Sequence, residues 1–67
     1  MLKLRDLTVP DINKCKELCN FTDDELKCFI LKTKDKSNVA VAKEMHISES
    51  QVSNLMRKIR SKIGRIL

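Results

Sequence analysis

Glycine, proline and aromatic residues are scarce in this chain of 67 residues, which has one Gly, one Pro, two Phe and neither Trp nor Tyr. This composition, with 42% hydrophobic and 34% charged residues, excludes a collagen-like or intrinsically disordered chain and is typical of a helical protein. A domain of this size buries only about 60% of its unfolded surface, so it has no volume to enclose a large substrate. We therefore expect a binding module rather than an enzyme.

The cysteine and histidine spacings of metal sites are also missing. Cys15, Cys19 and Cys28 include no Cys-x-x-Cys pair, and the single histidine, His46, is far from them in sequence. Gly-rich phosphate loops and the His-x-x-x-His or Glu-x-x-His metal spacings do not occur either. We expect no metal, no other cofactor and no catalytic group. Cys15 and Cys19 lie one helical turn apart and are interpreted as small core residues.

Segments that would direct the chain into a membrane are absent as well. No apolar run approaches the roughly 20 residues that span a bilayer. The N-terminal segment lacks the unbroken apolar core of a secretory signal. The odd number of cysteines agrees with a reducing compartment, so we expect a cytoplasmic protein without a membrane partner.

Positive charge is what the chain has in excess, with a net charge of +5. Residues 1–31 carry five basic and six acidic side chains, a net −1, whereas residues 32–67 carry nine basic and three acidic ones, a net +6. From Arg57 to Arg65 there are five basic residues and no acidic one. A one-sided positive field attracts polyanions, of which nucleic acid comes first and an anionic membrane surface second.

Apolar spacing predicts an all-α fold, a small four-helix domain with no linker that would divide it. We expect helices over about residues 9–19, 23–33, 38–45 and 49–63. The expected N-terminal caps are Thr8, Thr22, Ser37 and Ser48, and Thr22 with Glu25 has the capping-box spacing. The residues expected inward on the first helix are Ile12, Cys15, Leu18 and Cys19.

The fourth predicted helix has two distinct faces. Its apolar stripe consists of Val52, Leu55, Met56, Ile59 and Ile63. The opposite side carries only polar or cationic residues, namely Ser50, Asn54, Arg57, Lys58, Ser61 and Arg65. Together with the short helix and the tight turn that precede it, this helix makes a candidate helix-turn-helix, with Ala42 small enough for a close crossing.

Residues 21–64 contain three motifs at a distinctive spacing. They read Phe21-Thr22-x-x-Glu25, then Ser37-Asn38-x-x-Val41-Ala42-x-x-Met45-x-Ile47-Ser48-Glu49-x-x-Val52-x-Asn54, then Lys62-Ile63-Gly64. This pattern resembles the LuxR/GerE-type DNA-binding domain, which reads approximately Leu-Thr-x-x-Glu, Ser-Asn-x-x-Ile-Ala, Ile-Ser-x-x-Thr-Val-x-x-His and Lys-Leu-Gly. The C-terminal helix-turn-helix of bacterial sigma factors is similar, but Ser37-Asn38 and Lys62-Ile63-Gly64 favour the LuxR/GerE type.

The chain departs from the family at several points. Asp35 stands where the family often has Gly, and Gln51 stands where it has Thr. The family's fourth helix, which commonly mediates dimerisation, has no counterpart after Gly64, so its dimer geometry is not carried over. We expect one domain over residues 1–67, with an N-terminal arm and extra helix (1–20) before the LuxR/GerE-like core (21–64). The resemblance implies a transcription regulator of a bacterium or of a phage in a bacterial host.

The resemblance and the two-faced helix together predict that the protein binds duplex DNA in the major groove. Recognition helices contact bases with their N-terminal residues, so the expected base contacts are Ser50, Gln51, Ser53, Asn54 and Arg57. Asn54 or Gln51 can pair bidentately with adenine, and Arg57 with guanine. The expected phosphate contacts are Lys36, Ser37, Asn38, Lys43, Lys58, Arg60, Ser61, Lys62 and Arg65.

Other interpretations stay open at this point. A sigma-like or anti-sigma interaction module would dock on RNA polymerase or another regulator without reading DNA, through an exposed surface of Leu2, Leu4, Leu7, Ile66 and Leu67. Residues 55–67 could form a basic amphipathic helix on a membrane, although a domain this small needs their apolar stripe for its core. We also expect a homodimer, through the N-terminal helix or through Ile63, Ile66 and Leu67.

Overall fold

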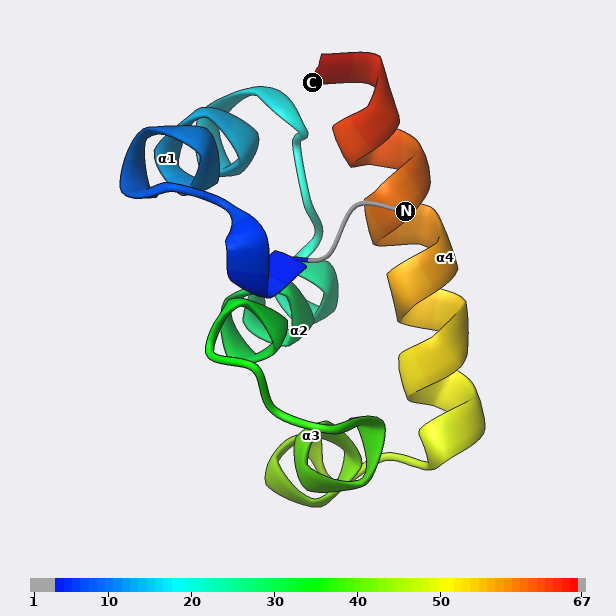
Figure 1. Cartoon of the computed structure of the whole chain (residues 1–67). Coiled ribbons are helices and arrows are strands. Elements are labelled where there is room, and N and C mark those ends of the chain that lie inside the picture. Colours follow the sequence, from blue (N-terminus) through cyan, green and yellow to red (C-terminus); the bar gives the residue numbers. More distant parts are fainter. Residues whose placement is uncertain (1–3, 67) are drawn as a thin grey trace.

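The computed structural model describes residues 4–66, which form a short 3-10 helix and four α-helices. In chain order they are η1 (Leu4–Asp6), α1 (Val9–Leu18), α2 (Asp23–Thr33), α3 (Asn38–Met45) and α4 (Glu49–Ile66). No strand occurs within residues 4–66, so the predicted all-α, four-helix fold is confirmed. Figure 1 shows α1, α2 and α3 arranged along α4, with α3 near its N-terminal end and α1 near its C-terminal end.

Side-chain caps fix where the helices begin. At α2, the Glu25 N–H donates to Thr22 Oγ1 at 3.2 Å, and the Thr22 N–H donates to Glu25 Oε1 at 3.0 Å. Thr8 and Asp11 form the same reciprocal box at α1, and Ser37 caps α3. Each box satisfies two backbone donors that a helix leaves without an intrahelical partner. The predicted caps at these three helices are therefore confirmed.

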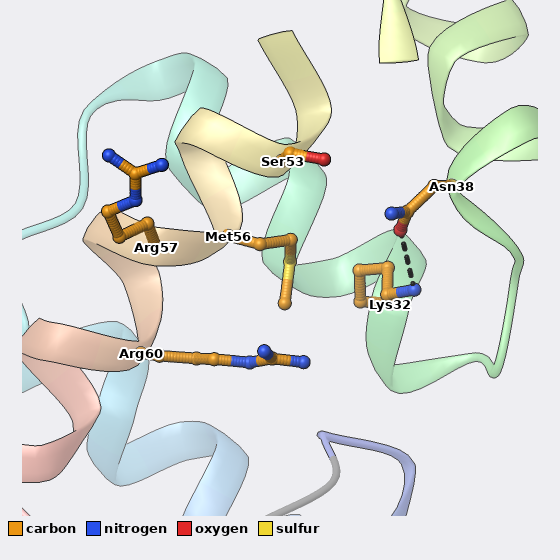
Figure 2. Close-up of a pocket in the computed structure, with 6 residues that line it drawn as sticks. All are labelled: Lys32, Asn38, Ser53, Met56, Arg57 and Arg60. Carbon is orange, nitrogen blue, oxygen red and sulfur yellow. Dashed lines mark hydrogen bonds between the residues drawn. The ribbon is translucent and has the colours of Figure 1, made fainter. Parts of the chain in front are cut away.

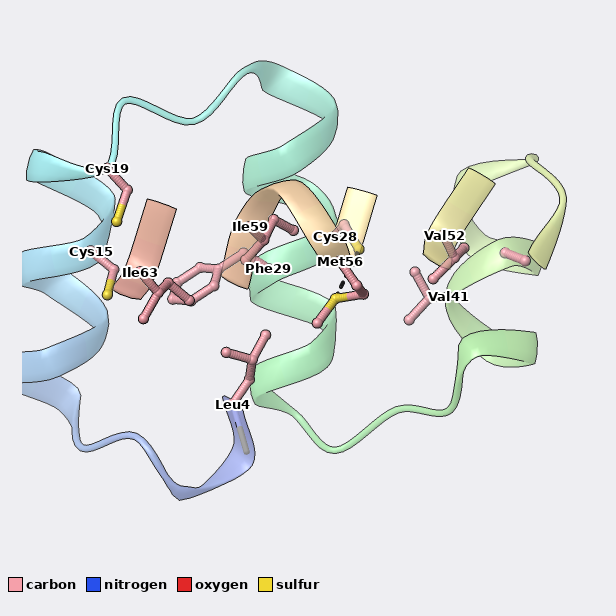
Figure 3. Packing of buried hydrophobic residues seen from close by; sticks show 11 residues of the cluster. Leu4, Cys15, Cys19, Cys28, Phe29, Val41, Val52, Met56, Ile59 and Ile63 are labelled. Carbon is pink, nitrogen blue, oxygen red and sulfur yellow. Dashed lines mark hydrogen bonds between the residues drawn. The ribbon is translucent and has the colours of Figure 1, made fainter. Parts of the chain in front are cut away.

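The core lies around α2, which packs against α3, α4 and η1. Phe29 is fully buried on α2, with its ring centroid 5.0 Å from that of Phe21. The buried apolar cluster, drawn in Figure 3, consists of Leu4, Cys15, Cys19, Cys28, Phe29, Val41, Ala42, Val52, Met56, Ile59 and Ile63. It contains the predicted apolar stripe of α4 except Leu55, which packs against it in a half-buried position. The interpretation of the cysteines as core residues is confirmed.

One apolar residue of α1 points away from the core. Leu18 was expected to be buried but is 55% exposed, whereas Cys15 and Cys19 are buried. The stripe that packs inward runs through Ile12, Cys15 and Cys19, and Leu18 falls about a quarter turn away from it. The prediction for Leu18 was wrong because it was based on the apolar character of the side chain. The position of Leu18 around the helix axis directs the side chain away from the core.

Two leucines of the described N-terminal segment, Leu4 and Leu7, pack against the core. Leu4, expected to be exposed, is only 5% exposed, because η1 packs against α2. Leu7 and Ile66 are half-buried and also pack against the core cluster. Leu2 and Leu67, which completed the predicted partner surface, lie outside the described residues. Of the residues predicted for that surface, the structure therefore buries Leu4 and half-buries Leu7 and Ile66.

Three connections each contain a non-glycine residue with positive φ. Asn20 has a φ of 52°, Asp35 of 61° and His46 of 58°. Asn and Asp tolerate this left-handed conformation better than most residues, and glycine adopts it without steric cost. The prediction that Asn20 ends the first helix region in this way is confirmed. Glycine would also fit this position of the loop, because it adopts a positive φ without steric cost.

The last helix is longer than predicted, since it continues through Gly64 to Ile66. The sequence predicted that the helix would end near Ile63, because the glycine that follows weakens a helix. In the structure, half-buried Ile66 packs against the core, and this contact favours one further turn of α4. Gly64 is exposed, and a Cβ built there would meet nothing within 4 Å.

Gly64→Ala should therefore stabilise the protein. Alanine removes the entropic cost of a glycine in a helix, so the free energy of unfolding should rise by about 0.5–1 kcal/mol. For a domain of this size, that corresponds to a melting temperature higher by about 2–8 °C. Thermal unfolding followed by circular dichroism measures the change, and a lower melting temperature would show that α4 does not run regularly through this position.

Candidate nucleic-acid interface

A tight turn joins α3 to α4. Helix α3 ends at Met45, its C-cap His46 adopts the left-handed conformation, and the Ile47 N–H donates to Ala42 O at 3.0 Å. Val41 and Val52, one from each helix, are fully buried in the core on either side of this turn. The short helix, the turn and the long helix are thus held as one unit, in the arrangement that the sequence predicted.

The start of α4 is capped by Ser48 together with Gln51. The Gln51 N–H donates to Ser48 Oγ at 3.2 Å, and the Ser48 N–H donates to Gln51 Oε1 at 3.0 Å. Gln51, predicted as a base contact, therefore uses its amide oxygen within the helix cap. A bidentate contact with adenine needs both the oxygen and the nitrogen of a side-chain amide. Of the two residues predicted for adenine, Asn54 keeps its amide available.

One side of α4 carries exposed polar and cationic side chains. The predicted base contacts Ser50, Ser53, Asn54 and Arg57 are all exposed, as are Lys58, Arg60, Ser61 and Arg65. The only acidic residue of α4 is Glu49, in its first turn. The ion pairs formed among the described residues are Lys36–Glu44 and Lys62–Glu25, so none involves an arginine of α4 or Lys58. The positive charge of this face is not neutralised within the described part of the fold.

Lys62 is an exception to this pattern, because its ammonium group turns back toward α2. Its Nζ lies 2.5 Å from Glu25 Oε1, 3.4 Å from the Asn20 carbonyl oxygen and 5.9 Å from the centroid of the Phe21 ring. The Glu25 side chain is buried and also belongs to the α2 capping box. These contacts give Lys62, predicted as a phosphate contact, a role in stabilising the fold.

Two opposing influences act on the Glu25 carboxyl group. Burial favours its neutral form and raises the pKa, whereas the hydrogen bonds from Lys62 and from Thr22 stabilise the carboxylate and lower it. The hydrogen bonds prevail, so the pKa lies below its ordinary value of 4.5. Glu25 is ionised at neutral pH, and the pair with Lys62 joins α2 to α4.

Replacing Lys62 by methionine separates the two roles considered for it. Methionine keeps the apolar stem that packs beside Phe21 but leaves the Glu25 carboxylate without its cation. We expect the free energy of unfolding to fall by about 1–3 kcal/mol, since a buried charge loses its partner. The slope of log K against log salt for binding a DNA duplex should stay unchanged. A slope smaller by about 0.9 would instead assign Lys62 to a phosphate.

The predicted phosphate contacts on the α3 side have different surroundings. Lys36 Nζ lies 2.9 Å from Glu44 Oε1, and both side chains are partly exposed, so this pair is weak and open to competition. Asn38 is half-buried and accepts a hydrogen bond from Lys32 Nζ at 3.0 Å. Lys43 is exposed. Lys32 was not among the predicted contacts; it precedes the helix-turn-helix segment and reaches the first helix of that segment through this hydrogen bond.

All three cysteines are buried free thiols. Burial and the neighbouring Cys19 thiol raise the pKa of Cys15 to about 11, and burial also raises the pKa of Cys28.

Within residues 4–66, no three His, Cys, Asp or Glu side chains gather where they could hold a metal ion. None of the helices there has the length and apolarity to cross a membrane. The apolar stripe of α4 is used in the core, so the folded domain does not offer it to a membrane surface.

The large apolar residues that the described part of the chain exposes lie on α1 and α3. Val9 is 70% exposed and Leu18 is 55% exposed, both on α1, and Val39 on α3 is 46% exposed. Ile63, predicted as part of a dimer surface, is only 1% exposed and belongs to the core. Ile63 therefore cannot contact a second copy while the domain is folded.

Comparisons of the chain with protein-family models, with curated proteins and with solved structures find no match. The resemblance of residues 21–64 to LuxR/GerE-type domains thus rests on the motif positions themselves. Several of these positions have a structural role here. Glu25 and Lys62, from the first and last motifs, form the ion pair between α2 and α4. Asp35 has a positive φ where the family often has Gly.

Proposed function

We propose that this protein is a sequence-specific regulator of transcription that binds duplex DNA as a LuxR/GerE-type helix-turn-helix domain. Helix α4 lies in the major groove, and Ser50, Ser53, Asn54 and Arg57 contact base edges. The observation that carries the proposal is the exposed face of α4, whose arginines and Lys58 have no acidic partner among the described residues. The opposite face is buried, which holds this polar face rigidly on the domain.

The dimensions of α4 agree with this role. An α-helix with its side chains is about 10–12 Å across, and the major groove of B-DNA is about 12 Å wide. The side chains on the outer face of the helix then meet base edges, while those on its flanks meet the two phosphate backbones. This division assigns Asn54 and Arg57 to bases. It assigns Lys58, Arg60, Ser61 and Arg65 to phosphates, with Lys43 of α3 and the Lys36–Ser37 segment that precedes α3.

The cap at the start of α4 gives a reason to propose that Asn54, and not Gln51, contacts adenine. Gln51 would have to release the Ser48 N–H before its amide could pair with a base, which would leave a helix donor without its partner. Asn54 is exposed and makes no such contact. The proposal therefore places one Asn–adenine and one Arg–guanine contact at the centre of the recognition face.

Selection of bound sequences from a pool of random duplexes tests this function. We expect enrichment of a short motif that contains an adenine and a guanine at neighbouring positions, with affinity that falls steeply as salt is raised. Equal binding of the selected and unselected duplexes would reduce the proposal to non-specific DNA binding. No binding of any duplex at low salt would refute it.

Dimerisation is part of the proposal, because a single small domain makes few specific contacts and paired half-sites are common for helix-turn-helix proteins. The surface proposed is the side of α1 on which Leu18 is exposed. A palindromic motif in the selection experiment would support a symmetric dimer. Sedimentation of a monomer, both free and on the selected duplex, would refute it.

A further inference from the structure

A hollow of about 360 Å³ lies on the flank of α4 that faces the junction of α2 and α3. Figure 2 shows the side chains that line it, which are Lys32, Asn38, Ser53, Met56, Arg57 and Arg60. Three of these are cations and none is acidic. By contrast, a hollow on the other flank of α4, beside Lys58 and Asn54, includes the carboxylate of Asp24. The two flanks of the helix therefore differ in charge.

Lys32 is held in place at the edge of this hollow without a negative partner. Its half-buried ammonium group donates to the Lys36 carbonyl oxygen at 3.1 Å and to Asn38 Oδ1 at 3.0 Å. Both acceptors are neutral, and no ion pair of the described residues involves Lys32. A lysine has three donors, so one N–H remains for a further acceptor. An ordered cation without a counter-charge favours binding of an anion beside it.

Arg60 approaches the same space from α4. In Figure 2 its side chain extends from α4 toward the side of the hollow on which Lys32 lies, whereas the Arg57 guanidinium is directed away from that side. Arg60 is exposed and takes part in no ion pair among the described residues. Two cations from different helices thus border one hollow, and Arg57 stays available on the outer face.

We infer that this hollow binds one backbone phosphate of the DNA duplex between Lys32 and Arg60, an inference that rests on the proposed function. With α4 in the major groove, a phosphate backbone runs along each flank of the helix. The flank with Lys32 and Arg60 receives a phosphodiester, and its charge-assisted hydrogen bonds fix the register of the domain on the duplex. Helix α2, which precedes the helix-turn-helix segment, therefore supplies one of the phosphate contacts through Lys32.

Neutralising either cation tests the inference. Lys32→Gln and Arg60→Gln should each weaken binding to all duplex sequences about tenfold, and each should lower the salt slope by about 0.9. Lys27→Gln is the matched control, because Lys27 is an exposed lysine of the same helix α2 and does not line the hollow. It removes the same charge and should change affinity by less than about twofold.

Thermal unfolding shows whether each variant is folded, which matters because Lys32 also bonds to the α2–α3 connection. If Lys32→Gln is unfolded, Arg60→Gln decides, since Arg60 makes no hydrogen bond among the described residues that its loss would break. A neutral methylphosphonate placed at successive positions of the selected duplex should weaken the wild type wherever the domain contacts a phosphate, and one of these positions per domain should belong to the hollow. At that position it should have no further effect on the Lys32→Gln, Arg60→Gln double variant.

The experiments give different results when only the phosphate site is absent and when the protein does not bind DNA. If the wild type binds duplex DNA and Lys32→Gln and Arg60→Gln behave like the Lys27→Gln control, the phosphate site is refuted while DNA binding stands. If both variants lose affinity but no single methylphosphonate reproduces the loss, the one-phosphate site is likewise refuted. If the wild type binds no duplex, both the function and the site are refuted.

Discussion

Replacing Glu25 by alanine should lower the free energy of unfolding by about 2–3 kcal/mol. The change removes the second half of the α2 capping box and leaves the half-buried Lys62 ammonium without its carboxylate. It also opens space beside the N-terminus of the most central helix. For a domain of this size, the loss corresponds to a melting temperature lower by roughly 10–20 °C.

Glu25→Gln is the matched control, because glutamine can serve in a capping box. Its amide oxygen can still accept from the Thr22 N–H, and only the charge is lost. We expect a cost of about 1 kcal/mol for this variant. The difference between Glu25→Ala and Glu25→Gln then measures the cap, and the difference between Glu25→Gln and the wild type measures the ion pair.

The pH dependence of unfolding tests whether the ionised Glu25 carboxylate stabilises the fold. Because the pKa of Glu25 is lower in the folded protein than its ordinary value of 4.5, the carboxylate stabilises the fold fully above that value. The stabilisation is lost as the pH falls through the folded-state pKa. Urea unfolding at a series of pH values should show the wild type losing its advantage over Glu25→Gln in acid. An advantage that persists unchanged in acid would contradict the ion pair.

Arg57→Ala should weaken binding to the selected duplex by about 1–3 kcal/mol, which is about 5- to 150-fold. Arg57 is exposed at the centre of the α4 recognition face, and its guanidinium can donate two hydrogen bonds to the O6 and N7 atoms of one guanine. The preference at that base pair should be lost, while the preferences at the other positions remain. Fluorescence anisotropy with single-substitution duplexes measures both effects.

Arg57→Lys separates charge from recognition, since lysine keeps the charge but lacks the planar fork of donors. We expect this variant to retain the salt slope and most of the non-specific affinity, and to lose most of the discrimination at the same base pair. If Arg57→Ala weakens every sequence alike and lowers the salt slope by about 0.9, Arg57 contacts a phosphate instead.

The fold was largely predictable because its signals are local. The residues that cap α1, α2 and α3 precede those helices in sequence, and the spacing of three or four residues between Val52, Met56, Ile59 and Ile63 defines the buried face of α4. Helix ends were harder to predict, since the extension of α4 to Ile66 depends on packing against residues distant in sequence. The burial of Leu4 likewise depends on how the N-terminal arm folds back on α2.

The residues on the outer face of α4 could be predicted from the sequence, whereas the contacts of the lysines on its flanks could not. Helical periodicity places Asn54 and Arg57 opposite the buried stripe, and both are exposed. Lys62 and Lys32 depend on contacts between elements, which periodicity does not contain. Lys62 pairs with a residue 37 positions away, and Lys32 bonds to the N-terminal residue of another helix. These two contacts are the reason that the structure changes the expectation for Lys62 and draws attention to Lys32.

The position of the interface on the folded domain is the central claim, and an amide chemical-shift titration with the selected duplex tests it most directly. We predict the largest shift changes on α4 between Ser50 and Arg57, with further changes at Lys32, Asn38 and Arg60. The α2 N-terminus around Glu25 should change little. Changes that centre on α1 while α4 stays unperturbed, or no changes with any duplex at low salt, would contradict the account.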